Sequence, residues 1–238
     1  MPKGPIHDAA QRGDVAALRR ALGEGALPNE LGAFGQAPLH YLCREGDNAE
    51  DRLACLHVLL EAGADVNALS GEQQTPLHNA ACYCPAKLVA ALILEGADVN
   101  RGDLYNNTPL HWACMRRNSD VKPAKLLIKN GAAATVNVRD NSGYSPLDHA
   151  IIYYYNLRRF VPILLRAGAA LPTQTDDAYL QKKIARNAYL QKVIAAGGFD
   201  QYERNHLATL TATVKSKLGL PARPARRVAE YAFHAGNY

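Results

Sequence analysis

Cysteine and histidine are the residue types in this chain whose chemistry could bind a metal ion or attack a substrate. Cys43, Cys82 and Cys114 each follow a histidine by three or four residues, and Cys82 and Cys84 form a C-x-C pair close to His78. Thiolates and imidazoles are zinc ligands, and a zinc–sulfur bond is about 2.3 Å long. If the three segments stack side by side, their equivalent residues lie about 10 Å apart and cannot share one ion. We therefore expect no metal site, and we expect these cysteines to fill small buried spaces as apolar groups.

The histidines could in principle act as catalytic bases. His40, His78 and His111 each close a recurring tetrapeptide, which reads T-P-L-H or a close variant of it. The chain contains no glycine-rich phosphate loop, no G-x-S-x-G nucleophile elbow and no H-E-x-x-H zinc motif. We therefore predict a structural role for these histidines, with no catalytic residue, no cofactor and no enzymatic activity.

The elements that position these residues can be read from the stretch 75–100. Thr75 suits the N-cap of a helix, because its hydroxyl can accept from free amides of the first turn, and Pro76 follows where a missing N–H costs nothing. Leu77 begins an apolar face, and Gly96 suits the end of a second helix, where φ is usually positive. Such a helix pair cannot bury its own apolar face, so it needs a neighbour on each side.

The same unit recurs along the chain. T-P-L-H stands again at 108–111, and variants of it stand at 37–40, 145–148 and, more degraded, 4–7. The glycines that close the second helix are Gly25, Gly63, Gly96, Gly131 and Gly168, at spacings of 38, 33, 35 and 37 residues. A period near 33 with a T-P-L-H signature is typical of ankyrin repeats, and residues 4–171 resemble that family.

The resemblance implies an all-α fold, an ankyrin-repeat α-solenoid of helix pairs with short β-hairpin loops, capped by C-terminal helices. It also implies that the tetrapeptide histidine forms hydrogen bonds within and between repeats. The expected domains are an ankyrin-repeat domain, residues 4–171, and a helical C-terminal cap or tail, residues 172–238. The expected repeats are 4–31, 32–69, 70–101, 102–138 and 139–171. Repeat 2 is longer than repeat 3 by five residues around 47–52, which we expect to form a surface loop.

After Leu171 the period is lost, and helix signals take its place. An octapeptide at 178–185 recurs almost unchanged at 188–195, and the offset of ten residues is close to three helical turns. We therefore expect both copies on neighbouring faces of one helix. The expected helices of the tail are 177–196, 200–218 and 224–235. We expect them to cover the exposed face of the last repeat.

The formal charge is unevenly distributed. Residues 172–238 carry ten Lys and Arg against five Asp and Glu, and their net +5 equals the formal charge of the whole chain. A basic tail can bind nucleic acid or an anionic membrane, which we keep as an alternative function. The charge is mild and has no dense basic run, so we do not expect nucleic acid as a partner.

The cellular setting follows from composition. The five cysteines are an odd number, and residues 1–5 lack the features of a secretory signal. No run of about 18 apolar residues predicts a membrane span. We expect a monomeric intracellular protein with reduced thiols, in the cytoplasm or the nucleus.

The family's usual activity is binding another protein through the hairpin tips and the concave surface formed by the first helices. The repeat phase predicts which residues those are here. Aromatics, Met and Arg, which are enriched in protein interfaces, are common among them. The candidate protein-binding residues are Phe34, Gln36, Arg44, Glu72, Gln74, Tyr83, Tyr105, Asn107, Met115, Arg116, Arg139, Tyr144 and Tyr153. Trp112 directly follows a tetrapeptide histidine, at a position that is usually buried, and we interpret it as core.

A second alternative is a substrate adaptor of a ubiquitin ligase, in which the repeats hold the substrate and the tail recruits the ligase. The tail is similar to a SOCS box in its spaced leucines 207, 210 and 218, its Leu220–Pro221 pair and its closing helix with Tyr231. It departs from that motif by lacking the cysteine of the first helix and by a shorter link between the helices. An F-box-like tail is an equally loose match.

Overall fold

Each T-P-L-H tetrapeptide begins an α-helix in the computed structural model. At Thr75 the backbone is extended, and Pro76 occupies the first turn of the helix. One detail differs from the expectation. The Thr75 hydroxyl does not accept from a free amide; it lies 2.9 Å from Nδ1 of His78, to which it donates. Nδ1 of His78 also accepts from the Thr75 backbone N–H at 3.0 Å. The histidine ring is therefore the acceptor for both groups of Thr75.

The structure describes residues 3–44, 48–116, 120–153, 157–172 and 176–235, and within these ranges every regular element is helical, with no strand. The expected all-α fold is therefore confirmed. The chain divides into two compact units, residues 1–169 and 170–238, a boundary two residues before the one expected from the repeat phase.

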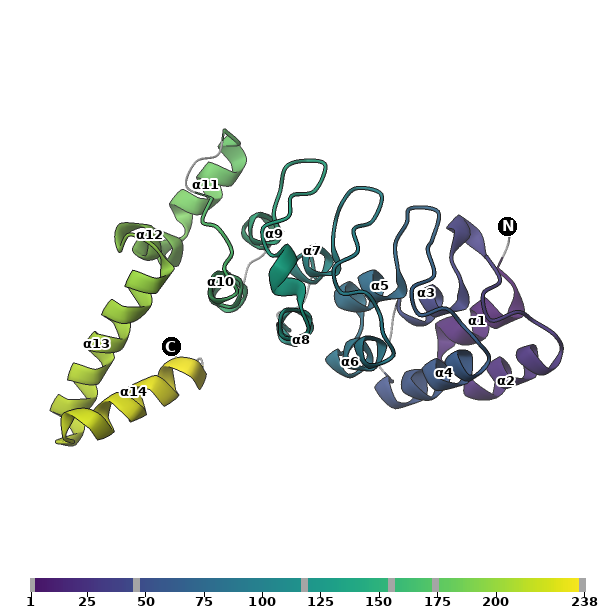
Figure 1. The fold of residues 1–238 in the computed structure, drawn as a ribbon, viewed down its shortest axis with the longest axis horizontal. Coiled ribbons are helices and arrows are strands. Elements are labelled where there is room, and N and C mark those ends of the chain that lie inside the picture. Colours follow the sequence, from purple (N-terminus) through teal and green to yellow (C-terminus); the bar gives the residue numbers. More distant parts are fainter. Residues whose placement is uncertain (1–2, 45–47, 117–119, 154–156, 173–175, 236–238) are drawn as a thin grey trace. The chain divides into compact units, whose positions relative to one another are not determined.

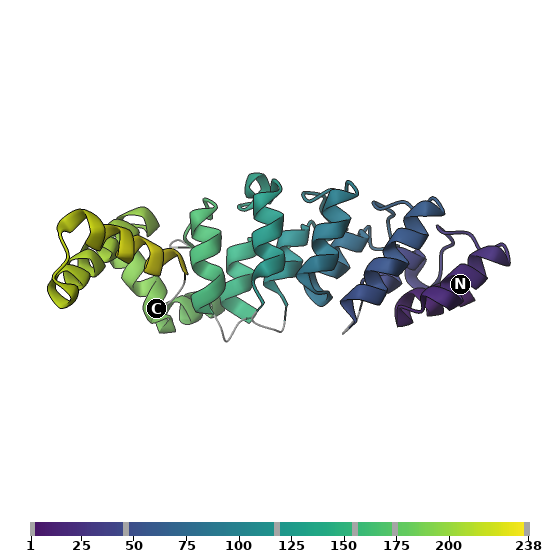
Figure 2. The ribbon, with the colours of Figure 1, turned by 90° about the horizontal axis from the view of Figure 1, so that it is seen from below.

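The first unit is a row of five helix pairs, in which the helices that begin at the tetrapeptides lie next to one another in chain order (Figure 1). Viewed from below, successive pairs follow one another along the row (Figure 2). The first, or inner, helices are α1 (Pro5–Arg12), α3 (Pro38–Leu42), α5 (Pro76–Tyr83), α7 (Pro109–Cys114) and α9 (Pro146–Tyr153). The second, or outer, helices are α2 (Val15–Gly23), α4 (Ala49–Glu61), α6 (Ala86–Leu94), α8 (Lys122–Lys129) and α10 (Leu157–Arg166).

The core of this unit lies between the two rows of helices. The tetrapeptide leucines Leu39, Leu77, Leu110 and Leu147 are fully buried, as are Leu59, Leu92 and Leu164 of the outer helices. Burying one leucine side chain contributes about 2 kcal/mol. Because each inner helix packs against the next, the apolar face that one repeat cannot cover is covered by its neighbour.

The extra residues of repeat 2 were expected to form a surface loop. Part of them instead forms the first turn of a helix. Residues 45–47 lie outside the described ranges, but Asn48 caps α4 and Arg52 is buried inside that helix. The Arg52 guanidinium donates to the carbonyls of Leu42 and Gln11, at the ends of α3 and α1. The last carbonyls of a helix have no hydrogen-bond donor within that helix. The added turn of α4 supplies the missing donor, the Arg52 guanidinium, to the ends of α3 and α1.

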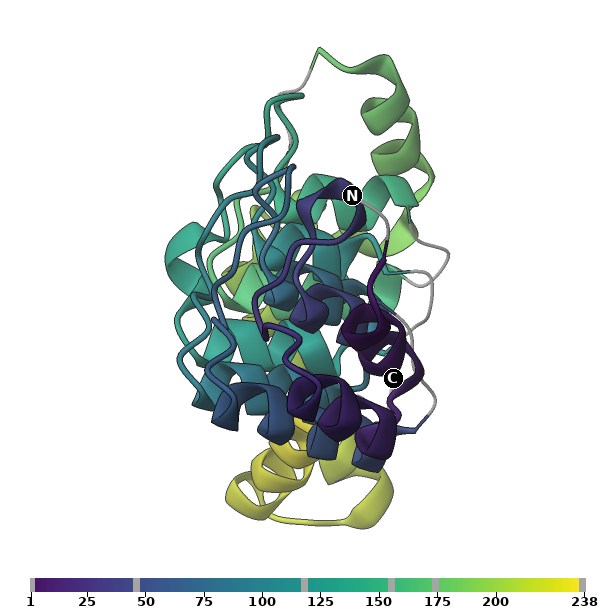
Figure 3. The ribbon, with the colours of Figure 1, turned by 90° about the vertical axis from the view of Figure 1, so that its right-hand side faces the viewer.

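The hairpin loops between repeats are short turns closed by backbone hydrogen bonds. Gly32 N–H donates to Gln36 O at 2.9 Å, Ser70 N–H to Gln74 O at 3.0 Å, and Asp103 N–H to Asn107 O at 2.9 Å. Two 3₁₀ turns accompany the stack, η1 (Ala33–Gly35) and η2 (Ala132–Thr135). The hairpin loops project on the same side of the inner helices (Figure 3).

The second unit contains α11 (Ala178–Arg186), α12 (Ala188–Ala195), α13 (Phe199–Leu218) and α14 (Ala222–Ala235). The expectation of one helix carrying both octapeptides is wrong. Asn187 breaks it with an extended backbone, and its side chain accepts from Leu190 N–H as the N-cap of α12. The copies therefore form two short helices, each with its own cap. The helix expected over 200–218 is confirmed, and it ends at Gly219 with φ +63°.

Candidate functional site

The tetrapeptide histidines connect each repeat to the next. In His40, His78 and His111, Nδ1 lies within hydrogen-bonding distance of the backbone N–H three residues earlier. Nε2 lies 2.8 Å from Gln74 O, 3.0 Å from Asn107 O and 3.2 Å from Tyr144 O, which are carbonyls of the following hairpin. Each ring thus accepts at one nitrogen and donates at the other, because a carbonyl oxygen can only accept.

These contacts require a neutral imidazole. A second proton would have to sit on Nδ1, which already accepts a hydrogen bond. Burial, which disfavours the charged form, lowers the pKa of His40 and lowers the pKa of His78 and of His111 to about 4. The histidines therefore serve the structure of the stack.

The hairpin tips are joined to one another by backbone hydrogen bonds. Gly71 N–H donates to Phe34 O at 2.8 Å, Leu104 N–H to Glu72 O at 2.9 Å, and Asn141 N–H to Tyr105 O at 2.9 Å. Gly35 in the first tip has φ +65°, and an added Cβ would lie 2.9 Å from Gly71 N, so the first link needs glycine there. The four tips thus form one continuous edge.

A buried aspartate holds the tip of each of the last two hairpins. Oδ1 of Asp103 accepts from Tyr105 N–H at 2.9 Å and from Asn107 N–H at 2.8 Å, and its Oδ2 accepts from the Trp112 indole N–H at 3.0 Å. Asp140 repeats this arrangement with Ser142 N–H and Tyr144 N–H on Oδ1. Its Oδ2 lies 2.7 Å from His149 Nε2, which corresponds to Trp112. Each carboxylate therefore orients both a hairpin tip and a ring on the adjacent inner helix.

Aromatic side chains are exposed along this edge and along the ends of the inner helices. Phe34 and Tyr105 at the tips are 79% and 50% exposed, and Tyr83 and Tyr153 at the helix ends are 51% and 58% exposed. We call the set Phe34, Tyr83, Tyr105, Trp112, Tyr144 and Tyr153 the aromatic surface. Exposed apolar side chains mark an interaction site where they form a contiguous patch.

The aromatic surface is internally ordered by ring contacts. The Tyr83 and Trp112 rings lie edge to face, with centroids 6.5 Å apart. Tyr153 stacks on His149 at 5.6 Å with an interplanar angle of 8°, and Tyr144 meets the same imidazole edge to face. The side chains of Tyr83, Trp112, Tyr144 and Tyr153 are therefore held before any partner arrives.

Trp112 differs from its interpretation as core. It is half-buried, because its indole N–H reaches across to Asp103 and lays the ring beside Tyr83. The equivalent residues of the preceding repeats, Tyr41 and Asn79, are buried, so the repeat phase alone predicted burial. The sequence did contain a signal for this outcome. Asp103 lies nine residues before Trp112, as Asp140 lies nine residues before His149, and each aspartate can accept from the ring that follows it.

The remaining predicted residues fall into three groups. Arg44, Glu72 and Arg139 are exposed, although Arg139 also contacts Asp148 Oδ2 at 3.3 Å. Asn107 and Met115 are half-buried, as is Tyr144 of the aromatic surface. The third group is buried and consists of Gln36, Gln74 and Arg116.

Gln36 and Gln74 are not available to a partner, contrary to the prediction. They directly precede the tetrapeptide, where the chain turns inward to begin the inner helix. The Gln74 carbonyl accepts from Ser70 N–H and from His40, and its side-chain amide donates to Glu72 at 2.6 Å. The Gln36 side chain accepts from Arg44 at 3.4 Å.

Arg116 is also buried, with 5% of its surface exposed, and the prediction that it faces a partner needs correction. Its Nη1 donates to Cys84 O at 2.6 Å and to Ala81 O at 3.5 Å, which are carbonyls at the end of α5. Arg116 serves that helix end as Arg52 serves the ends of α1 and α3. Repeat phase could not separate these outcomes, because a long side chain can leave the face of its own helix.

The cysteines are all free thiols, and they differ in burial. Cys43 and Cys114, three residues after their histidines, are fully buried, whereas Cys82, four residues after His78, is half-buried. Ala81 occupies the buried place in that repeat. Within the described residues, no three or more His, Cys, Asp or Glu side chains form a group able to hold a metal ion.

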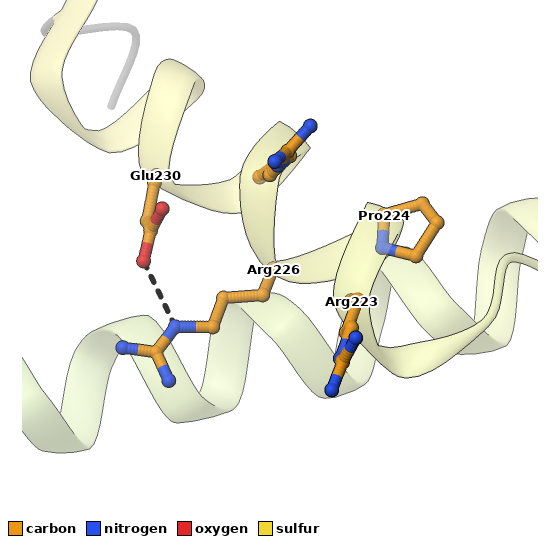
Figure 4. A pocket seen from close by; sticks show the side chains of 5 residues that line it. Arg223, Pro224, Arg226 and Glu230 are labelled. Carbon is orange, nitrogen blue, oxygen red and sulfur yellow. Dashed lines mark hydrogen bonds and ion pairs between the residues drawn. The ribbon is translucent and has the colours of Figure 1, made fainter.

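Three of the ten Lys and Arg residues of the tail lie on α14. Arg223, Arg226 and Arg227 line a hollow of about 520 Å³ together with Pro224 and Glu230 (Figure 4). Glu230 pairs with Arg226 at 2.8 Å. The described residues include no helix that is long and apolar enough to cross a lipid bilayer.

Comparison with known proteins places these features in a family. A family model of ankyrin repeats, built from three repeat copies, matches residues 6–103 and 85–176. Inversin from Canis lupus familiaris is 35% identical over 162 residues, which are 68% of this chain and 14% of inversin. Ankyrin repeat and SOCS box protein 16 from Homo sapiens is 39% identical over 191 residues, covering 63% of this chain and 40% of that protein.

A further relative has a name that includes an enzymatic activity. Putative palmitoyltransferase ZDHHC13 from Danio rerio is 28% identical over 185 residues, covering 77% of this chain and 27% of that protein. The chain thus spans less than half the length of each of these relatives. The matched family model covers most of the chain, and the histidine links and hairpin tips are those expected of such repeats. The chain therefore belongs to the ankyrin-repeat family.

Proposed function

We propose that this chain is a non-enzymatic interaction module that binds a protein partner through the aromatic surface, together with Arg44, Glu72, Asn107, Met115 and Arg139. The single observation that carries the proposal is the exposure of four aromatic side chains, Phe34 and Tyr105 at the hairpin tips and Tyr83 and Tyr153 at the ends of the inner helices. Tyrosine, tryptophan and arginine are enriched among the residues that dominate binding energy in interfaces.

The order of the surface supports tight binding. The linked hairpin tips and the two aspartates already hold the backbone of Tyr105 and Tyr144 and the indole of Trp112 in place. Association then loses less conformational entropy than it would with mobile loops. The proposal includes a monomer inside the cell, in the cytoplasm or nucleus, with no nucleic acid as partner. The five free cysteines support a reducing compartment.

The proposal predicts that Tyr83→Ala combined with Tyr105→Ala loses the partner. Truncating aromatic hot-spot residues costs about 2 kcal/mol or more, which corresponds to a roughly 30-fold weaker affinity. The measurement is quantitative mass spectrometry of proteins retained by each variant, followed by titration of the recovered partner. Because both side chains are half exposed, the unfolding midpoint is expected to fall only slightly, through loss of the Tyr83–Trp112 ring contact.

The matched control is Tyr179→Ala. Tyr179 is similarly exposed, at 53%, but it belongs to α11 in the second unit. This variant is expected to retain the same partner as the wild type. If the double variant retained that partner with full affinity, binding through the aromatic surface would be refuted.

A second candidate function is that of a ubiquitin-ligase substrate adaptor, with α13 and α14 as the ligase-recruiting segment. Two observations favour it. One relative is named as an ankyrin repeat and SOCS box protein. In addition, Leu207, Leu210 and Val214 of α13 are only half-buried and Leu218 is 62% exposed, although they share one side of the helix.

The adaptor hypothesis predicts that subunits of a ubiquitin ligase co-purify with the full chain. Leu210→Arg is expected to abolish their recovery, because a charge would replace an apolar contact. Leu27→Arg is the control, since Leu27 is an exposed leucine of the first unit. Recovery of no ligase subunit by the wild type, or equal recovery by Leu210→Arg, would remove this function.

A further inference from the structure

Two thiols from neighbouring repeats meet at the ends of their inner helices. Cys43 is the C-cap of α3 and Cys84 is the C-cap of α5, and both side chains are fully buried. The Cys84 thiol donates to the Cys43 carbonyl at 3.2 Å, and the two thiols are also in hydrogen-bonding contact with each other.

Two buried guanidinium groups flank this thiol pair. Arg52 donates to the carbonyl of Leu42, the residue before Cys43, and Arg116 donates to the carbonyl of Cys84 itself at 2.6 Å. Both arginines are about 5% exposed, so little water screens their charge. A thiolate formed here is therefore stabilised from two sides.

The pair differs electrostatically from the other buried cysteines. The hydrogen bond from Cys43 lowers the pKa of Cys84; burial opposes this effect, and the charges of Arg52 and Arg116 add to it. The same hydrogen bond, together with burial, raises the pKa of Cys43. Burial alone raises the pKa of Cys114, and burial as the main cause raises the pKa of Cys55 to about 11.

We propose that Cys43 and Cys84 are an oxidative modification site, at which a hydroperoxide produces a disulfide between repeats 2 and 3. Because the pair is buried, peroxide reaches it when the helix ends open locally. The Cys84 thiolate then attacks a peroxide oxygen, the O–O bond breaks, and the departing hydroxide takes a proton and leaves as water. The resulting sulfenic acid is attacked by Cys43, the S–S bond forms, and the S–O bond breaks to release a second water. In total, two thiols and one hydrogen peroxide become one disulfide and two waters.

The bond would cross-link two repeats that otherwise touch through packing and hydrogen bonds. It joins two residues that lie 41 positions apart in the sequence. A disulfide of this kind stabilises chiefly by restricting the unfolded chain. Oxidation is therefore expected to raise the thermal midpoint of the first unit, and a thiol reductant is expected to reverse the rise.

The test treats the full-length wild-type chain with hydrogen peroxide, digests it without reduction, and identifies linked peptides by mass spectrometry. The expected product is one intramolecular link between the fragment with Cys43 and the fragment with Cys84. Cys55, Cys82 and Cys84 share a tryptic fragment, because no Lys or Arg lies between Arg52 and Lys87. Two variants assign the link: Cys82→Ser is expected to keep it and Cys84→Ser to lose it.

Cys114→Ala serves as a control for any buried thiol and is expected to form the link normally. The proposal would be overturned if the wild type formed no link to Cys43 while Cys82 was oxidised or joined two chains. A link that survives in Cys84→Ser would equally overturn it. Circular dichroism of each variant before oxidation establishes whether that variant is folded. If a variant is unfolded, the linked peptides of the wild type still decide whether Cys43 forms the disulfide.

Discussion

Lowering the pH from 7 to 5 is expected to destabilise the repeat unit by about 4 kcal/mol through His78 and His111. In the folded chain the pKa of each is about 4, against an ordinary value of 6.5. Above pH 6.5 both rings are neutral in either state, and the full stability is present. Below it the unfolded chain binds protons that the folded chain does not, so stability falls by about 1.4 kcal/mol per pH unit for each ring.

The loss continues until the folded rings titrate near pH 4, but measurement between pH 7 and 5 avoids the ordinary titration range of the carboxylates. Urea unfolding followed by fluorescence suits this protein, because Trp112 is its single tryptophan and contacts the His78 ring edge to face. His78→Gln is expected to remove about half of the pH dependence, and His57→Gln, at an exposed site of α4, to leave it unchanged. A free energy of unfolding that stays constant from pH 7 to 5 would contradict the assigned hydrogen bonds.

Asp103→Ala is expected to lower the free energy of unfolding by about 3 kcal/mol. The substitution strands four donors at once: the backbone amides of Tyr105 and Asn107, the side-chain amide of Asn107 and the indole N–H of Trp112. Hydrogen bonds to a charged group contribute about 1.5–3 kcal/mol each, and a buried donor left without a partner costs about 1–3 kcal/mol. Tyr105 and Trp112 would also lose their orientation, so partner binding is expected to weaken together with stability.

The preceding hairpin offers a matched comparison. There Ser70 stands in the place of Asp103, and its hydroxyl accepts from Glu72 N–H and Gln74 N–H at 3.3 and 3.2 Å. Asp103→Ser is therefore expected to retain part of the stability that Asp103→Ala loses. Urea unfolding of the two variants beside Asp98→Ala, an exposed aspartate, measures the difference. Equal stability of Asp103→Ala and the wild type would show that the carboxylate does not hold the tip.

The prediction of the repeats succeeded because each of their signals is local. A proline in the first turn and a glycine with positive φ act over a few residues, so Pro76 and Gly96 mark helix ends in any context. The family resemblance implied that the histidines form hydrogen bonds within and between repeats. The structure shows which atoms form them, Nδ1 within the repeat and Nε2 to the next hairpin. In the tail, local signals found the helix over 200–218 but missed the break at Asn187. An asparagine can occupy a helix interior or cap the next helix. The local sequence pattern does not decide between these two positions.

The sequence by itself determined that residues 4–171 form a stack of five helix pairs, and which face of each pair turns toward the hairpins. Only the tertiary structure decided which acceptors the long side chains on that face reach, and therefore whether they are buried or exposed. Arg116 turns inward because the carbonyls at the end of α5 have no other donor within their helix, and Trp112 is drawn outward by Asp103. Both contacts join groups from different turns or repeats. Helical periodicity assigns a residue to a face, but it carries no information about the acceptor that its side chain reaches.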